Sequence, residues 1–390
     1  MLIITAPGQG AQTPGFLAPW LELPGVAERL GTASELAGCD LVRFGTTADA
    51  EEIKDTAVAQ PLLVAAAIVA AEALSGVAAG SADAAAGHSV GELAGGVIAG
   101  VLTADDAMRL TGVRGRAMAA AAAIEPTGMT VVLGGDQDEV LAAIARNDLT
   151  PANINAAGQI VAAGTMTALA AFAADPPAGA RLHPLQVAGA FHTRYMAPAV
   201  AALRDAAAGV SVADPALTLL SNADGAAVTT GKEWLERVVA QVAAPVRWDL
   251  CMRTMADLGV TALIELPPAG TLTGLARRAL PGVARLALKT PDQLDAAREL
   301  IAEHLVAAHL AEPEDHAHRP EWRLIVAPTS GTFRSGGEQL GTVVARGGER
   351  AVSAPWPLGS TEIIEWLVED GDPVSEGQPL VRVQPDGMAG

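Results

Sequence analysis

Aromatic residues and cysteines are scarce in this chain. Only 3% of its 390 residues are aromatic although 50% are hydrophobic, so the core must be packed with Ala, Val and Leu. Alanine-rich segments favour helices over strands, and the composition predicts a mixed α/β fold. Cys39 and Cys251 lie far apart without metal-ligand spacing, which disfavours a disulfide scaffold or a zinc site. We expect two buried thiols, no metal and a reducing, cytoplasmic location.

Basic residues and long apolar runs are also few. The formal net charge is -19, which argues against nucleic acid or an anionic membrane as a bulk partner and means that an anionic substrate needs a specific arginine. The longest apolar run, residues 61–71, stops at Glu72 and is too short to span a bilayer. Residues 1–6 predict a short strand rather than a signal peptide. We therefore expect no membrane and no nucleic acid among the partners.

Length and pattern divide the chain into four parts. A length of 390 residues predicts two or three domains at roughly 150 residues each. We expect an α/β core at residues 1–127 and 187–308, interrupted at 128–186 by a ferredoxin-like subdomain built from two β-α-β units. A polar linker follows at 309–321; its three histidines lack a carboxylate or cysteine set, which favours solvent exposure over metal binding. Short strands and turns predict a small all-β domain at 322–385.

Hydrophobic periodicity predicts the individual elements. We expect strands at residues 2–6, 129–133, 160–163, 181–187, 217–220, 262–266, 324–327, 341–345, 363–368 and 379–383, and helices at 60–74, 104–123, 136–146 and 166–174.

One hexapeptide gives the clearest chemical signal. Gly-His-Ser-Val-Gly-Glu at residues 87–92 follows a run of small residues and precedes an apolar, helix-like stretch. A G-x-S-x-G pattern is typical of a nucleophile elbow, a strained turn between strand and helix that exposes the serine hydroxyl beside helix N–H groups. The pattern predicts acyl-transfer chemistry at Ser89, with an ordinary loop serine as the alternative. A second glycine loop, at residues 7–12, follows the first strand, where α/β sheets keep their sites.

A serine nucleophile needs a base, normally histidine. Of the seven histidines, His88 would point away from the nucleophile in an elbow, and His183 lies within a predicted strand. Four others lie at the end of the core or in the linker. His192 lies in a glycine-introduced loop just after the subdomain, and we predict that it is the base.

With these residues the chain resembles the malonyl-CoA:acyl carrier protein transacylases over residues 1–305. The matching motifs are Gly-Gln-Gly-Ala-Gln at 8–12, the hexapeptide at 87–92, Arg-Gly-Arg-Ala-Met at 114–118, Asn-Ile-Asn-Ala-Ala-Gly-Gln at 153–159, Ala-Phe-His at 190–192, and Gln241 followed by Pro-Val-Arg-Trp at 245–248. They occur in the family's order, which makes the resemblance specific.

The resemblance implies an acyltransferase core with a parallel sheet and a ping-pong reaction in fatty acid or polyketide synthesis. Ser89 would attack malonyl-CoA, CoA would leave, and the phosphopantetheine thiol of acyl carrier protein would attack the malonyl-enzyme, with His192 as base and then acid. The backbone N–H groups of Gln9 and Val90 would bind the oxyanion. CoA and phosphopantetheine enter as substrates, and no cofactor is implied.

The malonyl carboxylate cannot be buried unpaired, so the pocket needs a cation with a planar pair of donors. The family match gives this role to Arg114, which otherwise would be a solvated helix arginine. It also implies that Phe191 fills the space of an α-methyl group, with a core aromatic as the alternative. A main-chain carbonyl near Gln241 would orient His192, and Asn155 is a pocket candidate, although a turn-stabilising role fits it nearly as well.

The tail is similar to another family. Residues 369–380 resemble the second half of biotinyl and lipoyl carrier domains, which have a barrel-sandwich fold and attach their cofactor to a lysine on a hairpin. The matching hairpin is at residues 346–350, but Lys54, Lys232 and Lys289 all precede the tail. We therefore expect no covalent biotin or lipoate and predict a protein-docking or packing module.

Two other functions remain open. A serine esterase or thioesterase of the α/β-hydrolase fold would use a late histidine, His304, in place of His192. A non-catalytic scaffold would bind partners through its tail, although the presence of Ser89, His192 and Arg114 argues against it.

Overall fold

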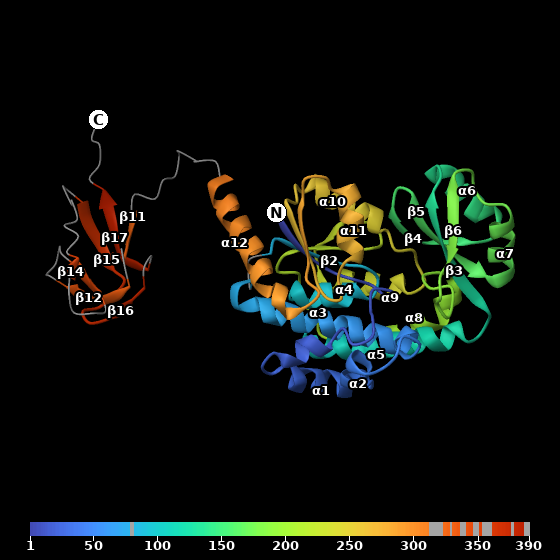
Figure 1. Ribbon diagram of the computed structural model, residues 1–390, viewed down its shortest axis with the longest axis horizontal. Helices are drawn as coiled ribbons and strands as arrows, with labels where there is room; N and C mark the ends of the chain where they lie inside the picture. Colours follow the sequence, from blue (N-terminus) through green and yellow to red (C-terminus); the bar gives the residue numbers. More distant parts are fainter. Residues whose placement is uncertain are drawn as a thin grey trace. The chain divides into compact units, whose positions relative to one another are not determined.

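Two units make up the chain, Met1–His309 and Leu310–Gly390 (Figure 1). The computed structural model describes residues 1–78, 82–311, 323–327, 330–335, 341–345, 351–352, 361–375 and 378–385. Each unit has its own sheets and its own hydrophobic core.

The larger unit is built on a six-stranded sheet in the order β10-β9-β1-β2-β7-β8. Its strands are β1 (Leu2–Ala6), β2 (Ala84–Gly87), β7 (Thr218–Leu220), β8 (Ala227–Val228), β9 (Ala262–Glu265) and β10 (Ala284–Ala287). The pairs are parallel except for β7 with β8. Ala6 lies opposite Gly87 in the register, so the loops that follow β1 and β2 leave the same edge of the sheet side by side.

Helices cover both faces of this sheet. They are α1 (Val26–Ala37), α2 (Leu41–Thr46), α3 (Thr56–Ala78), α4 (Gly91–Ile98), α5 (Ala104–Ala122), α8 (Ala197–Ala207), α9 (Gly231–Gln241), α10 (Trp248–Asp257), α11 (Thr271–Ala279) and α12 (Leu294–Ala311), with short 3-10 turns between some of them. Side chains alternate between the faces along β1: Leu2 and Ile4 join the core under α3, α4 and α5, and Ile3 joins the core under α10 and α11 (Figure 1).

Apart from a few polar residues such as Thr56 and Gln60, helix α3 is apolar, as a helix in the centre of a core is expected to be. Its segment Thr56–Leu74 is the one stretch of the described residues with the length and hydropathy of a membrane span, and most of it is buried within the unit. The apolar run at 61–71 is therefore part of a longer apolar helix than the sequence indicated. Small and branched aliphatic side chains from Leu62 to Ala70 fill this core, as the composition predicts.

A four-stranded sheet forms the subdomain inserted between α5 and α8. Its elements are β3 (Thr127–Gly134), α6 (Gln137–Arg146), β4 (Thr150–Ala156), β5 (Gln159–Thr165), α7 (Met166–Ala174) and β6 (Ala180–Pro184). The strands pair antiparallel in the order β4-β5-β3-β6, a β-α-β-β-α-β arrangement of the ferredoxin-like kind. Val246 joins β4 to the core, because its N–H donates to Ala152 O at 2.9 Å and its carbonyl accepts from Ile154 N at 2.9 Å.

Two expectations about this unit need correction. Helix α12 continues to Ala311, so residues 309–311 are helical rather than linker, and residues 312–322 lie outside the described residues. Cys251 is buried, but Cys39 is only partly buried; both are free thiols.

The described residues of the smaller unit form two antiparallel sheets, β11-β17-β15 and β14-β13-β12-β16. Its strands are β11 (Arg323–Val326), β12 (Gly331–Ser335), β13 (Gly341–Ala345), β14 (Ala351–Val352), β15 (Thr361–Trp366), β16 (Pro373–Val374) and β17 (Pro379–Pro385). Phe333, Leu380 and three smaller side chains form its described core. The expected hairpin at 346–350 lies outside the described residues.

Candidate active site

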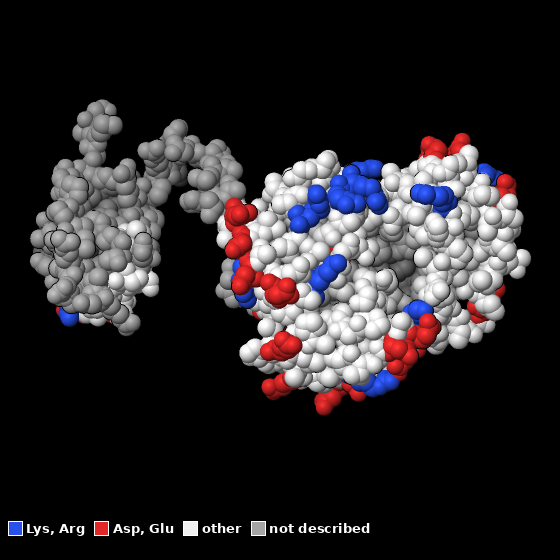
Figure 2. Space-filling view, viewed as in Figure 1, with Lys and Arg blue, Asp and Glu red and all other residues white. Residues whose placement is uncertain are grey.

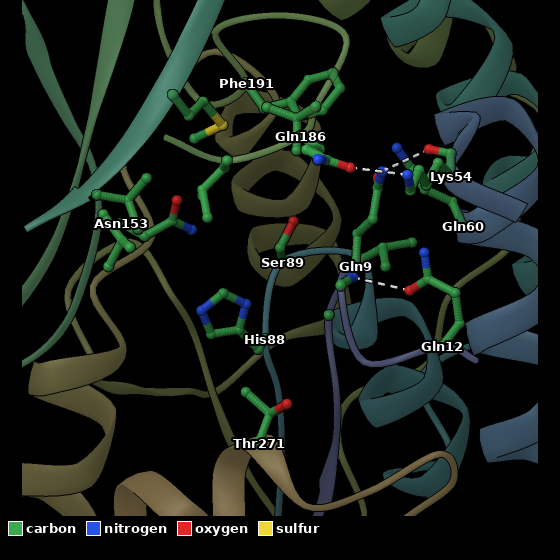
Figure 3. Close-up of a pocket in the computed structure, with 18 of the residues that line it drawn as sticks. Gln9, Gln12, Lys54, Gln60, His88, Ser89, Asn153, Gln186, Phe191 and Thr271 are labelled. Carbon is green, nitrogen blue, oxygen red and sulfur yellow. Dashed lines mark hydrogen bonds between the residues drawn. The ribbon is translucent and has the colours of Figure 1, made fainter. Parts of the chain in front are cut away.

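Ser89 lies on a sharp turn between β2 and α4, with a backbone φ of 53°. Glycine is needed on both sides of this turn. A Cβ on Gly87 would collide with the backbone of Gly91, and a Cβ on Gly91 would collide with the carbonyl oxygen of Ala6. The spacing of the glycines thus follows from close packing of the turn against β1, and it leaves the Ser89 side chain free to face the cavity (Figure 3).

His192 is the hydrogen-bond partner of this serine. Ser89 Oγ lies 2.7 Å from His192 Nε2, and His192 Nδ1 lies 2.9 Å from Gln241 O. Because a carbonyl oxygen only accepts, Nδ1 carries the proton and Nε2 is free to take the hydroxyl proton of Ser89. Burial and the nearby Arg114 lower the pKa of His192 to about 3. The imidazole is therefore neutral at physiological pH, the state that a general base requires.

Arg114 brings a buried positive charge to the same hydroxyl. Its side chain on α5 is 1% exposed, and Nη2 donates to Ser89 Oγ at 3.2 Å and to Gln241 Oε1 at 3.1 Å. Burial lowers the pKa of Arg114 to about 10 and Glu92 raises it, so the guanidinium stays charged. A cation held this close to a nucleophile suits an acyl group that carries its own negative charge.

The loop after β1 lies against the elbow. A Cβ on Gly8 would come within 2.7 Å of His88 Nδ1 and 2.8 Å of His88 O, so only glycine permits the contact. The neighbouring Gln9 and the residue after the nucleophile, Val90, both line the cavity with Ser89. The side chain of Gln9 is held by Thr56, because its Oε1 accepts from Thr56 Oγ1 at 2.7 Å.

These groups face one cavity of about 620 Å³ between the six-stranded sheet and the subdomain. Its opening is visible as a hollow in the face of the larger unit, surrounded mainly by uncharged residues (Figure 2). Ser89, His192, Arg114, Gln9, Val90, Asn155 and Phe191 all line it. Gln241 is absent from its described lining; it lies behind Arg114 and contacts His192 through its carbonyl and Arg114 through its amide.

Two other histidines, His88 and His304, lie at different positions relative to Ser89. His88 makes no hydrogen bond to Ser89, but it lines the same cavity, where its Nε2 lies 2.9 Å from Asn155 Oδ1 (Figure 3). Burial lowers the pKa of His88. His304 Nε2 lies 2.8 Å from Asp83 Oδ2; Asp83 precedes β2 and Ser89 follows it, so His304 is at the opposite end of the strand. This position rules out His304 as the base of an esterase site.

Two further polar residues support the site, and one of them, Asn222, lies outside the sequence motifs. Asn222 Oδ1 accepts from Ser89 N at 2.7 Å, and its Nδ2 donates to Gly87 O at 2.8 Å, so this side chain holds the elbow. Glu92 accepts from Asn222 N at 2.8 Å and from Gln241 Nε2, and burial raises its pKa to about 8. Glu92 is the last residue of the hexapeptide, whereas nothing near Asn222 marked it.

An activated hydroxyl beside a buried cation serves the transfer of an acidic acyl group, so fold and site place the chain in the class of serine-dependent acyltransferases. Residues 7–306 match the family described as the acyl transferase domain. Malonyl CoA-acyl carrier protein transacylase of Mycobacterium tuberculosis is 55% identical over 297 residues, which cover 76% of this chain and 98% of that protein.

Two solved structures are also similar. The crystal structure of the M. tuberculosis enzyme superimposes with a TM-score of 0.75 at 55% identity, covering 76% of this chain and 99% of that one. A holo type II PKS acyl-carrier protein bound to its malonyl-transacylase contains a chain with a TM-score of 0.72 at 30% identity, with coverage of 76% and 99%. This chain therefore belongs to the malonyl CoA-acyl carrier protein transacylase family.

Proposed function

We propose that this chain transfers malonyl from malonyl-CoA to the phosphopantetheine thiol of an acyl carrier protein through a malonyl-Ser89 intermediate, in fatty acid or polyketide synthesis. The observation that carries the proposal is the position of Ser89 Oγ, 2.7 Å from His192 Nε2 and 3.2 Å from Arg114 Nη2. Family membership supports the two substrates, since the relatives are malonyl transacylases and one is bound to its carrier protein.

The first half-reaction loads Ser89. His192 Nε2 takes the hydroxyl proton as Oγ attacks the thioester carbonyl, the C–S bond breaks, and the imidazolium returns the proton to the departing CoA sulfur. In the second half, His192 accepts the proton of the phosphopantetheine thiol while sulfur attacks the malonyl ester. Ser89 Oγ leaves and regains that proton, which restores the free enzyme.

The backbone N–H groups of Gln9 and Val90 are the proposed oxyanion donors. Both residues line the cavity next to Ser89, and Val90 is the N-cap of α4, where N–H groups have no partner inside the helix. One donor of this kind contributes about 100- to 1000-fold to the rate. The close packing of Gly8 on His88 supports a site in which both loops contribute.

Arg114 is the proposed partner of the malonyl carboxylate. A bound carboxylate also offsets the positive charge next to His192, which raises the pKa of the imidazole and makes it a stronger base when the correct acyl group is present. Phe191 is the proposed steric limit at the α-carbon and Asn155 a further pocket residue, since both line the cavity. Gln241 supports the site through its contacts with His192 and Arg114.

Intact-protein mass after brief exposure to malonyl-CoA tests this function. We expect a malonyl-sized mass gain in the unmodified chain and none in Ser89→Ala. Circular dichroism of Ser89→Ala provides the folding control. Absence of any adduct on the folded, unmodified chain would rule out the proposed reaction.

For the smaller unit we propose a biotinyl/lipoyl-like module that docks another protein, in a cytoplasmic enzyme. Its two antiparallel sheets and the sequence of residues 369–380 support this assignment. The absence of lysine after Lys289 removes the group to which biotin or lipoate would be attached, so the module acts without a covalent cofactor.

A further inference from the structure

A row of four side chains connects Arg114 to the loop that contains Gln9. Arg114 Nη1 donates to Gln60 Oε1 at 2.5 Å, and Gln60 Nε2 donates to Thr56 Oγ1 at 2.9 Å. Thr56 Oγ1 donates to Gln9 Oε1 at 2.7 Å, and Gln9 Nε2 donates to Lys54 O at 3.3 Å. An arginine only donates, which fixes the orientation of the Gln60 amide and, through it, the direction of every following hydrogen bond.

This row, which we name the Gln60–Thr56 relay, is built into the helix packing. Thr56 and Gln60 are each 1% exposed, and their separation of one turn places them on the same face of α3. A Cβ on Gly115, the residue after Arg114, would come within 2.9 Å of Thr56 O. The glycine thus allows α5 to approach α3 at the level of the relay, where Arg114 reaches Gln60.

The loop at the far end depends on the same segment. Gln12 Nε2 donates to Ile53 O at 3.1 Å, so both glutamine side chains of the loop bind the residues just before α3. Figure 3 shows Gln9, Gln12, Gln60 and Lys54 together on one side of Ser89. Thr56 is buried and is not among the described residues that line the cavity.

We propose that Thr56 and Gln60 are positioning residues that couple binding of the acyl carboxylate at Arg114 to the placement of the oxyanion loop at Gln9. A carboxylate that fixes the guanidinium also fixes Gln60, Thr56 and the Gln9 side chain, because buried hydrogen bonds in series constrain one another. The carboxylate then accelerates attack on the thioester instead of only improving affinity. This inference rests on the proposed function.

Thr56→Val tests the coupling, since it keeps the shape of the side chain and removes the hydroxyl. The acylation rate of Ser89 with malonyl-CoA is expected to fall about tenfold, or 1.36 kcal/mol, with little change in KM. The rate with acetyl-CoA, which brings no carboxylate, is expected to fall less than about threefold. Thr56→Ser retains the hydroxyl and is expected to restore the preference for malonyl.

Thr111→Val is the matched control. Thr111 is fully buried on α5 and its hydroxyl donates to Ala107 O at 2.6 Å, so this variant loses a comparable hydrogen bond away from the relay.

Gln60→Met breaks the relay between Arg114 and Thr56. This variant is used instead if Thr56→Val does not fold. An equal loss with malonyl-CoA and acetyl-CoA, or a loss no larger than that of Thr111→Val, would overturn the coupling. Failure of the unmodified chain to form a malonyl adduct would instead overturn the proposed function.

Discussion

Ser89 and His192, the proposed nucleophile and base, both have a backbone conformation that residues other than glycine rarely adopt. The φ angles are 53° at Ser89 and 61° at His192, and such left-handed residues cost about 1–3 kcal/mol each. Hydrogen bonds from Ser89 N to Asn222 and between His192 and Gln241 O hold the two residues in place. The strained backbone at both positions thus costs stability and fixes the distance between the Ser89 and His192 side chains.

The charge of Arg114 predicts a shift in the pH profile. Burial and Arg114 depress the pKa of His192 to about 3, so kcat/KM of the unmodified chain is expected to stay high when the pH falls below the ordinary histidine value of about 6.5. Arg114→Ala removes a positive neighbour and therefore raises this pKa, which moves the acid limb to higher pH. The measurement is kcat/KM for acetyl-CoA, a substrate that does not need the arginine, from about pH 3, near the pKa of His192, up to about pH 8.

Arg109→Ala is the control for this shift. Arg109 lies on the same helix, but its side chain is 53% exposed and pairs with Asp106, so its removal is expected to leave the profile unchanged. An acid limb that stays in place or moves to lower pH in Arg114→Ala would contradict the assigned electrostatics.

The predictability of the site differs from residue to residue. Ser89, His192 and Arg114 lie in local motifs whose residue types state their chemistry, and the structure brings their side chains together. Thr56 and Asn222 were not predictable, because each is a single polar residue that gains its role only from the segment that packs against it. His88 was expected to point away from the nucleophile; its ring contacts Asn155 and not Ser89, although it lines the same cavity.

At the scale of elements, several apolar segments were predicted with accurate bounds. Strand β1 and helix α7 have the expected bounds, and α5 begins as expected, because Thr103 caps its first turn by accepting from Asp106 N. Strands β8 and β10 were missed: β8 has two residues, and β10 is an edge strand with no buried side chain. Strand β4 was missed because its bulged pairing with β5 obscures the alternation of its side chains.

Because the elbow packs against β1, replacing Gly91, the first residue of α4, is expected to lower the free energy of unfolding, whereas replacing Gly274 inside α11 is not. Gly91→Ala brings a methyl group against Ala6 O, whereas a Cβ on Gly274 in α11 meets nothing within 4 Å. We expect Gly91→Ala to lower the free energy of unfolding by about 1–3 kcal/mol or more and Gly274→Ala to raise it by about 0.4–1 kcal/mol. Urea denaturation measures both, and equal values for the two variants would contradict the packing.

At the scale of the whole molecule, the reaction site belongs to one unit. All described residues that line the cavity lie between Gly8 and Leu275, and the family match ends at residue 306. Helix α12 completes this unit, because Ala297 and Ile301 are buried in its core. His304 links α12 to Asp83, the residue before β2, through a contact of 2.8 Å between Nε2 and Oδ2. The chain that follows α12 is therefore not needed to build the site.

Removal of residues 322–390 tests this separation. The truncated chain retains α12 and is expected to fold and to take up malonyl from malonyl-CoA at a rate within about twofold of the full chain, as an independent domain does. If the smaller unit docks the carrier protein, loading of Ser89 is expected to be unaffected while transfer to the carrier slows, because docking concerns only the second half-reaction. Stopped-flow measurement of each half-reaction separates the two effects. A truncated chain that is folded but no longer acylated would show that residues of the smaller unit contribute to the site.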